Sequence, residues 1–182
     1  NLIKTSIEGV TIIETKTFSD ARGEFTKNLC PKVLLKNNMT FNFTEAYYST
    51  SKRNVIRGMH FQLPPHNVAK LVTVLSGAVL DVVLDLRTNS KTYGDYIEIE
   101  LSKENKKSLI IPFGCAHGFQ SLADDTLMAY FQTGAFSAEC DRGIAFNSFG
   151  KKWDTNNHIM SERDLNHISF SEFQSPFRME DE

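Results

Sequence analysis

Short runs of aliphatic, aromatic and β-branched residues, separated by turn residues, recur through most of this chain of 182 residues. Such runs suit strands, and turn signals at these intervals are typical of an antiparallel sandwich or barrel, whose sheets must cover or close their edges. Helical spacing is credible only near Pro31–Leu35 and Ser161–Asp164. We therefore predict an all-β fold with short helical segments. The predicted strands are Val10–Thr15, Phe43–Tyr48, Lys70–Leu75, Ala78–Asp85, Tyr96–Leu101, Ser108–Ile111, Met128–Thr133 and Gly143–Phe146.

The length and charge of the chain indicate one ordinary domain. A chain of 182 residues can bury one good core, and its 41% apolar and 23% charged residues are close to the average of soluble proteins. The formal net charge of −2 gives no reason to expect a nucleic-acid partner. No apolar run reaches membrane-spanning length, so we expect no membrane partner. We predict a single domain over 1–182, with a looser C-terminal tail from about residue 169.

The cysteines bear on the cellular compartment. Cys30, Cys115 and Cys140 are odd in number and have no CxxC spacing. This pattern favours reduced thiols in the cytoplasm over a disulfide framework or a zinc site. Cys115 could be a nucleophile, but a buried small residue is the simpler interpretation. We therefore expect a cytoplasmic protein.

The stretch Asn54–Lys70 gathers an arginine, two histidines and a lysine just before an apolar strand. His60 can accept a proton near neutral pH, and Lys70 or Arg57 can stabilise negative charge that develops on an oxygen. On a strand, His60 would share a face with Gly58, which would leave room for a ligand. An isolated histidine is more often a hydrogen-bonded core residue, but the neighbouring cations favour a site for proton transfer beside a carbonyl.

Three further residues are weaker candidates when each is taken alone. His117 lies in a stretch with Pro112 and Gly118, where a tight turn and a missing side chain could leave space for a ligand. Tyr130 lies in an apolar strand and is most simply a packing residue, while Asp164 could equally cap a short helix. These residues form a plausible set for proton transfer, not a decisive one.

A metal site is not expected. His60 and His66 are six residues apart, and the sequence has no His-x-His pair with a following glutamate. A divalent ion needs three or more convergent ligands, so the chain does not fit a metal-dependent cupin dioxygenase.

Taken together, the motifs of this chain resemble the dTDP-4-dehydrorhamnose 3,5-epimerase family, a group of metal-independent cupins. The resemblance extends over nearly the whole chain, with its motifs in the family's order. It implies a cupin-type double-stranded β-helix, or jelly-roll barrel, and a homodimer whose N-terminal strands cross to the partner. It implies no metal and no other cofactor. The matching stretches are Asp20–Phe25, Val55–His66, Lys70–Arg87, Thr92–Tyr96, Ile111–Leu122, Ala129–Asn147 and Met160–Asp164.

The resemblance also implies a substrate and a set of catalytic residues. The substrate is a nucleotide-diphospho-4-keto-deoxy sugar, whose protons at C3 and C5 flank the C4 ketone. The motifs carry the family's base onto His60 and its orienting carboxylate onto Asp164. Tyr130 falls at the position of the proton-donating acid, and a phenol remains protonated at neutral pH. Lys70 falls where the family stabilises the C4 oxyanion.

The resemblance further implies substrate-binding residues, some of which depart from the family's usual pattern. Lys27 stands where the family commonly has Glu, so the nucleotide base need not be thymine. Phe136 replaces a common Tyr beside the sugar, which we expect to affect which carbon is inverted. Glu45 and Tyr47 stand where Gln and Asn are common, at positions expected around the base. The remaining binding residues implied by the resemblance are Arg57, His117 and Arg163 near the sugar and its diphosphate, and Arg22 and Phe25 in the crossing segment near the nucleotide.

The leading hypothesis is an epimerase that inverts C3, C5 or both of such a sugar through an enolate, for deoxysugar and surface-polysaccharide biosynthesis. One alternative is a nucleotide-sugar 3,4-ketoisomerase, which moves the carbonyl through a similar enolate. Another is a non-catalytic cupin that binds nucleotide sugars. His60, Lys70, Tyr130 and Asp164 are all present, and this favours epimerisation over both.

Overall fold

The protein folds as two β-sheets packed face to face, with short helices outside them. The structure is a computed structural model that describes residues 1–28, 31–36, 40–154 and 156–179. Cys30, expected to be a reduced thiol, lies outside these residues. None of the described residues belongs to a helix that is long and apolar enough to cross a membrane.

The described residues form one sheet of six strands and one of five. Every pairing within the two sheets is antiparallel. The first sheet has the order β1 (Leu2–Lys4), β2 (Thr11–Glu14), β10 (Lys107–Ile111), β7 (Lys70–Ser76), β12 (Thr126–Gln132) and β5 (Glu45–Ser51). The second has the order β13 (Asp141–Gly143), β6 (Ile56–Gln62), β11 (Cys115–Ser121), β8 (Ala78–Asp85) and β9 (Tyr96–Ser102).

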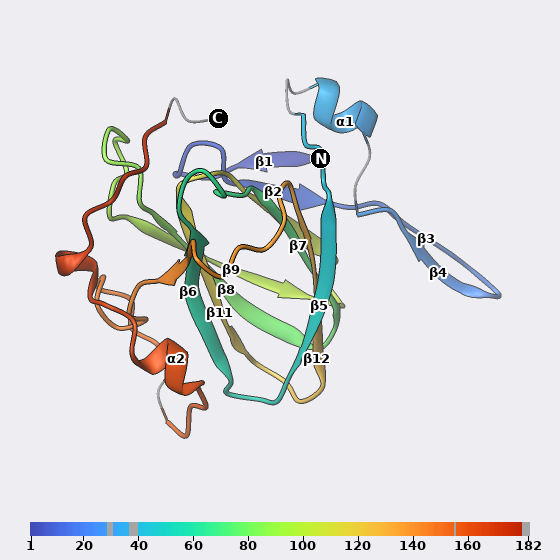
Figure 1. Cartoon of the computed structure of the whole chain (residues 1–182). Helices are drawn as coiled ribbons and strands as arrows, with labels where there is room; N and C mark the ends of the chain where they lie inside the picture. Colours follow the sequence, from blue (N-terminus) through green and yellow to red (C-terminus); the bar gives the residue numbers. More distant parts are fainter. Residues whose placement is uncertain (29–30, 37–39, 155, 180–182) are drawn as a thin grey trace.

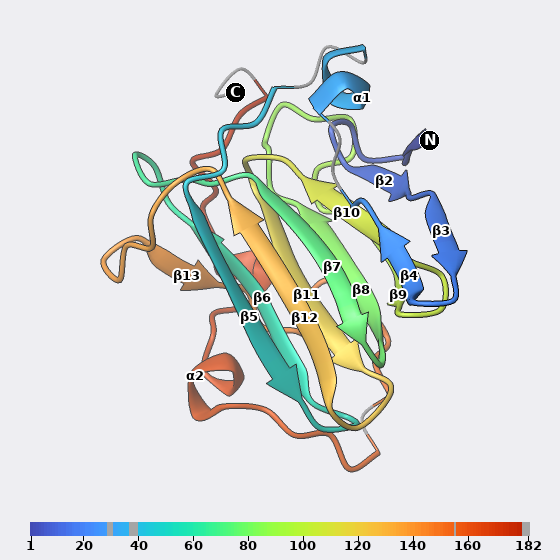
Figure 2. The same ribbon diagram turned by 90° about the vertical axis from the view of Figure 1, so that its right-hand side faces the viewer.

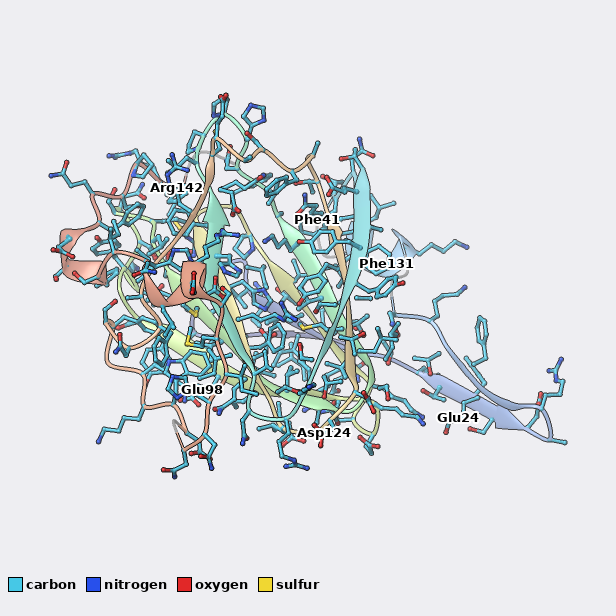
Figure 3. All side chains as sticks on the ribbon, turned by 60° about the horizontal axis from the view of Figure 1, so that its bottom comes forward. Glu24, Phe41, Glu98, Asp124, Phe131 and Arg142 are labelled. Carbon is cyan, nitrogen blue, oxygen red and sulfur yellow. The ribbon has the colours of Figure 1, made fainter. Side chains whose placement is uncertain are left out.

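A separate hairpin projects from this body. Strands β3 (Thr17–Asp20) and β4 (Gly23–Thr26) pair only with each other and extend away from the two sheets (Figure 1). Figure 3 shows Glu24 on this hairpin, well outside the side chains that fill the barrel. Its carboxylate forms an ion pair of 2.7 Å with Lys106, which ties one strand of the hairpin to the body.

The main core lies between the sheets and is made by the inward-facing residues of both. Alternation along the strands produces it, because every second side chain of a strand faces the opposing sheet. Val72 and Val74 of β7 belong to the same buried cluster as Val79 and Val83 of β8, and Phe119 of β11 completes the contact. Tyr130 also lies in this cluster.

A second apolar cluster covers the outer face of the five-stranded sheet. Met59 and Phe61 of β6 pack there against residues from the C-terminal third of the chain, including Trp153 and Phe177. Phe177 lies in the segment where we expected a looser tail, yet it is only 1% exposed. The C-terminal segment thus runs along the sheet and includes α2 (Glu162–Leu165) and the short helix η1 (Phe170–Glu172).

The all-β prediction is confirmed, including both predicted helical regions. The first helix, α1, spans Pro31–Lys36, and the second is α2. A tight turn was predicted only at Pro112–Gly114, and no strand was predicted for β11, which follows this turn and is buried along its whole length. Glycine and histidine are poor indicators of a strand, so a fully buried strand with this composition gives no alternation to detect. The strands β1, β3 and β4 were also missed, since each is short and lies at or beyond a sheet edge.

Behind β8, a buried ion pair fixes the loop that follows the strand. Arg87 and Asp85 are both fully buried, with Arg87 Nε 2.8 Å from Asp85 Oδ1. Ser90 and Thr92 each donate a hydroxyl hydrogen bond to Asp85 Oδ2, at 2.6 and 2.8 Å. Burial opposes ionisation of Asp85, but these donors prevail and lower the pKa of its carboxyl group.

Replacing Asp85 with Ala should strongly destabilise the protein, because it leaves a buried guanidinium without its carboxylate. We expect a loss of about 3–5 kcal/mol in the free energy of unfolding, measured by urea denaturation. Combining Asp85→Ala with Arg87→Met removes both charges and should recover part of that loss. If the double variant is no more stable than Asp85→Ala, the buried charge is not the cause.

Candidate active site

A cavity of about 320 Å³ opens where the two sheets meet at the ends of several strands. Strands β5, β6, β7 and β12 contribute to its wall, together with β13, the first turn of α2 and the loop after β12. Both positive and negative side chains face it. Its lining consists of Glu45, Tyr47, His60, Gln62, Lys70, Gln132, Phe136, Asp141 and Arg163.

His60 faces this cavity and forms a hydrogen bond with Asp164, a residue 104 positions later in the chain. His60 Nε2 lies 2.8 Å from Asp164 Oδ1. The other carboxylate oxygen accepts a hydrogen bond from the backbone N–H of Gly58 at 3.1 Å. Ser161 caps α2 by accepting from the N–H of Asp164, which fixes the backbone at this point. Figure 2 shows α2 beside the sheet that contains β6, and this packing brings the carboxylate to the histidine.

The environment holds the carboxylate ionised and the imidazole neutral. Burial alone would raise the pKa of Asp164, but the neighbouring imidazoles of His167 and His60 outweigh it and hold that pKa far below its usual range. Burial lowers the pKa of His60, Asp164 opposes this shift, and Arg163 and Lys70 add to it. An ionised Asp164 can only accept, so Nε2 of His60 carries the proton and Nδ1 keeps a free lone pair.

Lys70 supplies a positive charge to the wall of the cavity. It is the first residue of β7, and Asp141 of β13 lies near enough to interact with it electrostatically. Burial lowers the pKa of its ammonium group, and Asp141 partly opposes that shift. A poorly hydrated cation in this position interacts strongly with any negative charge that forms on a bound molecule.

Tyr130 lies beside the cavity, in the core between the sheets. Its ring stacks on Tyr47, with centroids 4.8 Å apart and planes 12° from parallel, and its hydroxyl lies 3.1 Å from Ser49 Oγ. Burial raises the pKa of Tyr130 above its ordinary value, so the phenol stays protonated. Burial and the charge of Glu45 likewise raise the pKa of Tyr47 to about 12. Tyr47, at a position expected near the nucleotide base, thus stacks on the predicted proton donor.

His117 and Arg57, two predicted binding residues, are held by protein partners. His117 is 5% exposed, and its Nε2 lies 2.8 Å from Asp81 Oδ2. Its ring meets that of Tyr130 edge-on, at 6.3 Å. Arg57 donates from Nε to Ser51 Oγ at 3.1 Å and from a terminal nitrogen to the backbone carbonyl of Thr50. Their contact with a substrate stays a prediction.

Three other predicted residues lie apart from His60 within one chain. Arg22 is at the tip of the projecting hairpin, where it pairs with Asp20 at 2.6 Å. Phe25 is 62% exposed on the same hairpin, and with Lys27 it lines a different cavity of about 280 Å³ at the hairpin's base.

Two glycines have a different role from the one their positions suggested. We expected Gly58 and Gly118 to leave room for a ligand. A Cβ on Gly58 would lie 2.5 Å from the Cα of Gly118, and one on Gly118 would lie 2.6 Å from Met59 Sδ. Gly58 also has a φ of +135°, which favours glycine. The two glycines therefore allow β6 and β11 to approach closely. The prediction that they leave space for a ligand is wrong.

The loop after β12 is tied to the cavity wall by Glu45, a predicted binding residue, and by two glutamines that were not among the predicted site residues. Gln62 accepts from the backbone N–H of Ser137 at 2.6 Å, and Gln132 donates to the carbonyl of Gly134 at 2.8 Å. Glu45 accepts from the N–H of Phe136 at 2.8 Å. Gln62 lies two residues after His60 on the same strand, so strand alternation could have indicated it.

Two charged or titratable residues of the site were also missed. Asp141 forms an ion pair of 2.6 Å with Arg163, and no spacing in the sequence links the two. His167 follows Asp164 by three residues, on the same side of a short helical turn. Among the described residues, His60, Asp164 and His167 form the one group of three side chains of metal-ligating type, with donor atoms within 4.8 Å of one another. The hydrogen bond between His60 and Asp164 already uses two of these atoms.

Comparison with known proteins identifies the family. The family model described as dTDP-4-dehydrorhamnose 3,5-epimerase matches residues 4–172. A protein of that name from Shigella flexneri is 38% identical over 173 residues, which is 93% of this chain and 96% of the relative. Another from Methanothermobacter thermautotrophicus is 38% identical over 90% of this chain and 91% of its own length.

Solved structures agree. The epimerase of Legionella pneumophila in complex with dTDP-4-keto-L-rhamnose is 32% identical and superposes with a TM-score of 0.90, covering 96% of this chain and 94% of that one. A 4-keto-6-deoxy sugar epimerase of Streptomyces spheroides is 30% identical with a TM-score of 0.90, covering 94% and 88%. The predicted cupin-type barrel is thereby confirmed. This chain belongs to the dTDP-4-dehydrorhamnose 3,5-epimerase family.

Proposed function

We propose that this protein is an isomerase that epimerises a nucleotide-diphospho-4-keto-6-deoxy sugar at C3, C5 or both, in deoxysugar biosynthesis. One observation carries the proposal: an imidazole held by a carboxylate lines the same cavity as a partly buried lysine. A base and an oxyanion partner on one cavity are what proton removal beside a ketone requires. The names of the relatives and of the solved structures support the same reaction.

The first step is removal of a proton from the carbon beside the ketone. His60 takes this proton on Nδ1, because Nε2 is bound to Asp164. The electron pair of the broken C–H bond moves into the ring to form an enolate, whose charge rests on the C4 oxygen. Lys70 stabilises that oxygen, and Asp164 stabilises the imidazolium formed on His60.

The second step returns a proton to the other face of the same carbon. Tyr130 is the acid in this proposal, since its raised pKa keeps the hydroxyl protonated until the enolate is close. The phenolate that forms can recover a proton through Ser49, whose hydroxyl lies 3.1 Å away. Inversion follows because base and acid act on opposite faces.

The remaining binding roles are assigned from the motifs and from the relatives. Solved relatives hold dTDP-4-keto-L-rhamnose in one case and TDP with pyrophosphate in another. We propose that Arg57, His117 and Arg163 serve the sugar and its diphosphate. Glu45, Tyr47 and Lys27 carry groups that differ from the family's common ones, so the nucleotide base and the final sugar are properties to be measured.

We further propose a homodimer in which the β3–β4 hairpin reaches the partner. Phe18 and Phe25 are opposite each other on this hairpin and are 57% and 62% exposed. Two such rings on a projecting hairpin are an apolar surface that a second copy can cover. Arg22 and Phe25 would then approach the partner's nucleotide. The cysteine pattern supports the further proposal that the protein is located in the cytoplasm.

The reaction itself is tested in D₂O with dTDP-4-keto-6-deoxyglucose, following deuterium entry at C3 and C5 by NMR. We expect His60→Ala to slow exchange at both carbons by about 100-fold or more, because the base is lost. Tyr130→Phe should keep exchange but lose inversion. Matched controls are His66→Ala and Tyr48→Phe, two exposed residues outside the cavity. Absence of exchange with every activated keto sugar would favour the non-catalytic binding protein. A product whose carbonyl has moved from C4 to C3 would favour the ketoisomerase.

The pH dependence of exchange should reflect His60 at acid pH and Lys70 at alkaline pH. His60 works as neutral imidazole and its pKa is lowered, so the acid limb of kcat/KM should have its midpoint below about 6.5. Lys70 works as ammonium and its pKa is also lowered, while that of Tyr130 is raised. The alkaline limb should therefore belong to the lysine, and Lys70→Arg should move it to higher pH. A limb that instead disappears in Tyr130→Phe would contradict this assignment.

The dimer is tested by the double variant Phe18→Ser, Phe25→Ser, which removes the exposed rings of the hairpin. We expect the mass in solution, measured by light scattering, to fall from that of two chains to that of one. The KM for the nucleotide sugar should rise as the partner's contribution is lost. Tyr93→Ser, at a ring that is 40% exposed outside the hairpin, should leave the mass unchanged. A double variant that keeps the mass of two chains would exclude the hairpin as the contact.

A further inference from the structure

The carboxylate that holds His60 is approached by a second imidazole, that of His167. Its Nε2 lies 3.4 Å from Asp164 Oδ1, the oxygen that is 2.8 Å from His60 Nε2. The rings of His60 and His167 meet edge-on, with centroids 5.6 Å apart and planes at 82°. Two imidazoles thus converge on one oxygen.

The side chain of His167 is almost completely buried at this contact. Its side chain is 10% exposed, and its Nε2 is inaccessible to solvent yet has no aligned hydrogen-bond partner among the described residues. A buried imidazole nitrogen without a good partner is costly, so its orientation towards the carboxylate has to be held by packing.

Gly143 supplies that packing. It is the last residue of β13 and is paired with His60 in the ladder between β13 and β6. A Cβ on Gly143 would lie 2.3 Å from His167 Nε2 and 2.4 Å from its Cδ2. The ring therefore rests directly on the backbone beside the base, in space that only glycine leaves open.

We propose that His167 is a positioning residue for the His60–Asp164 pair, which it sets by sharing the carboxylate oxygen. This inference rests on the proposed function and deepens it. His167 lies outside the cavity lined by His60 and Lys70, and lines instead a neighbouring cavity of about 560 Å³ with Arg142 and Arg163. It does not touch the substrate, and it acts only through Asp164.

The physical effect follows from the electrostatics of this 3.4 Å contact. With a proton on Nε2, His167 places partial positive charge beside Oδ1 and weakens the hold of that oxygen on the proton of His60. Arg163 and Lys70 act on His60 in the same direction, whereas Asp141 is paired with Arg163 and reduces that cation's effect. Without His167, the carboxylate binds the imidazolium more tightly, so the pKa of His60 rises and less neutral base is present at a given pH.

The test compares His167→Ala with His167→Gln, whose side-chain amide can place an N–H where Nε2 stands. We expect His167→Ala to lower kcat for deuterium exchange about tenfold at pH 6.5 and to move the acid limb to higher pH. His167→Gln should retain the wild-type midpoint and most of the rate. The KM should change in neither variant, because His167 does not line the substrate cavity.

Gly143→Ala and His66→Ala complete the experiment. Gly143→Ala should reproduce the shifted acid limb by displacing the ring, and His66→Ala should resemble the wild type. An equal loss of rate at all pH values, or a Gln variant as impaired as the Ala variant, would show a merely structural role and overturn the inference. So would a stoichiometric divalent ion that is bound by the wild type and lost in His167→Ala. A wild-type protein without any exchange would instead refute the proposed function, which separates the two failures.

Discussion

The hydrogen bond between His60 and Asp164 joins the central part of the barrel to its C-terminal segment, and the proposed chemistry depends on it. His60 belongs to a strand of the five-stranded sheet, whereas Asp164 lies on a four-residue helix outside that sheet. A helix this short has little stability of its own, so its position comes from tertiary packing. Met160 before the helix and Phe170 after it pack against the apolar cluster on the outer face of the sheet, and they hold the segment that contains the helix. Packing of this segment thereby positions the carboxylate that we propose orients the base.

The charges of the cavity are arranged so that each opposes another. Asp164 favours the protonated form of His60, while Lys70 and Arg163 oppose it. Asp141 is paired with Arg163 and also interacts with Lys70. A base that must take and release protons near neutral pH benefits from this balance, because a stronger carboxylate effect would leave the imidazole protonated. Burial of the site strengthens each of these electrostatic interactions, because they are screened less than on an open surface.

How much of this could be predicted from the sequence differs between the fold and the site. The strands rich in β-branched residues, such as Ala78–Asp85, were predicted at their observed bounds because composition and alternation agree there. By contrast, β11 was not predicted as a strand, since Gly118 and His117 give no strand-like pattern in a segment that is buried on both faces. His60 and Lys70 could be related through local spacing. Asp164 needed the resemblance to a family, because nothing local links a residue to a partner more than a hundred positions away.

Three of the four predicted departures from the family's common residues, Glu45, Tyr47 and Phe136, lie on the cavity wall, whereas Lys27 lies at the base of the hairpin. Tyr47 stacks on Tyr130 and donates a hydrogen bond of 3.3 Å to Gln132, while Glu45 accepts from the backbone of Phe136. These contacts do not involve His60 or Asp164 and instead fix the loop that carries Phe136 at the cavity. Substitutions at such positions alter the shape and polarity presented to the substrate without changing base or oxyanion partner. Because specificity is a difference between transition-state affinities, we propose that this wall distinguishes between sugars. The His60–Asp164 pair is supported instead by α2 and Gly143, so in the proposed mechanism selectivity and proton transfer depend on different parts of the barrel.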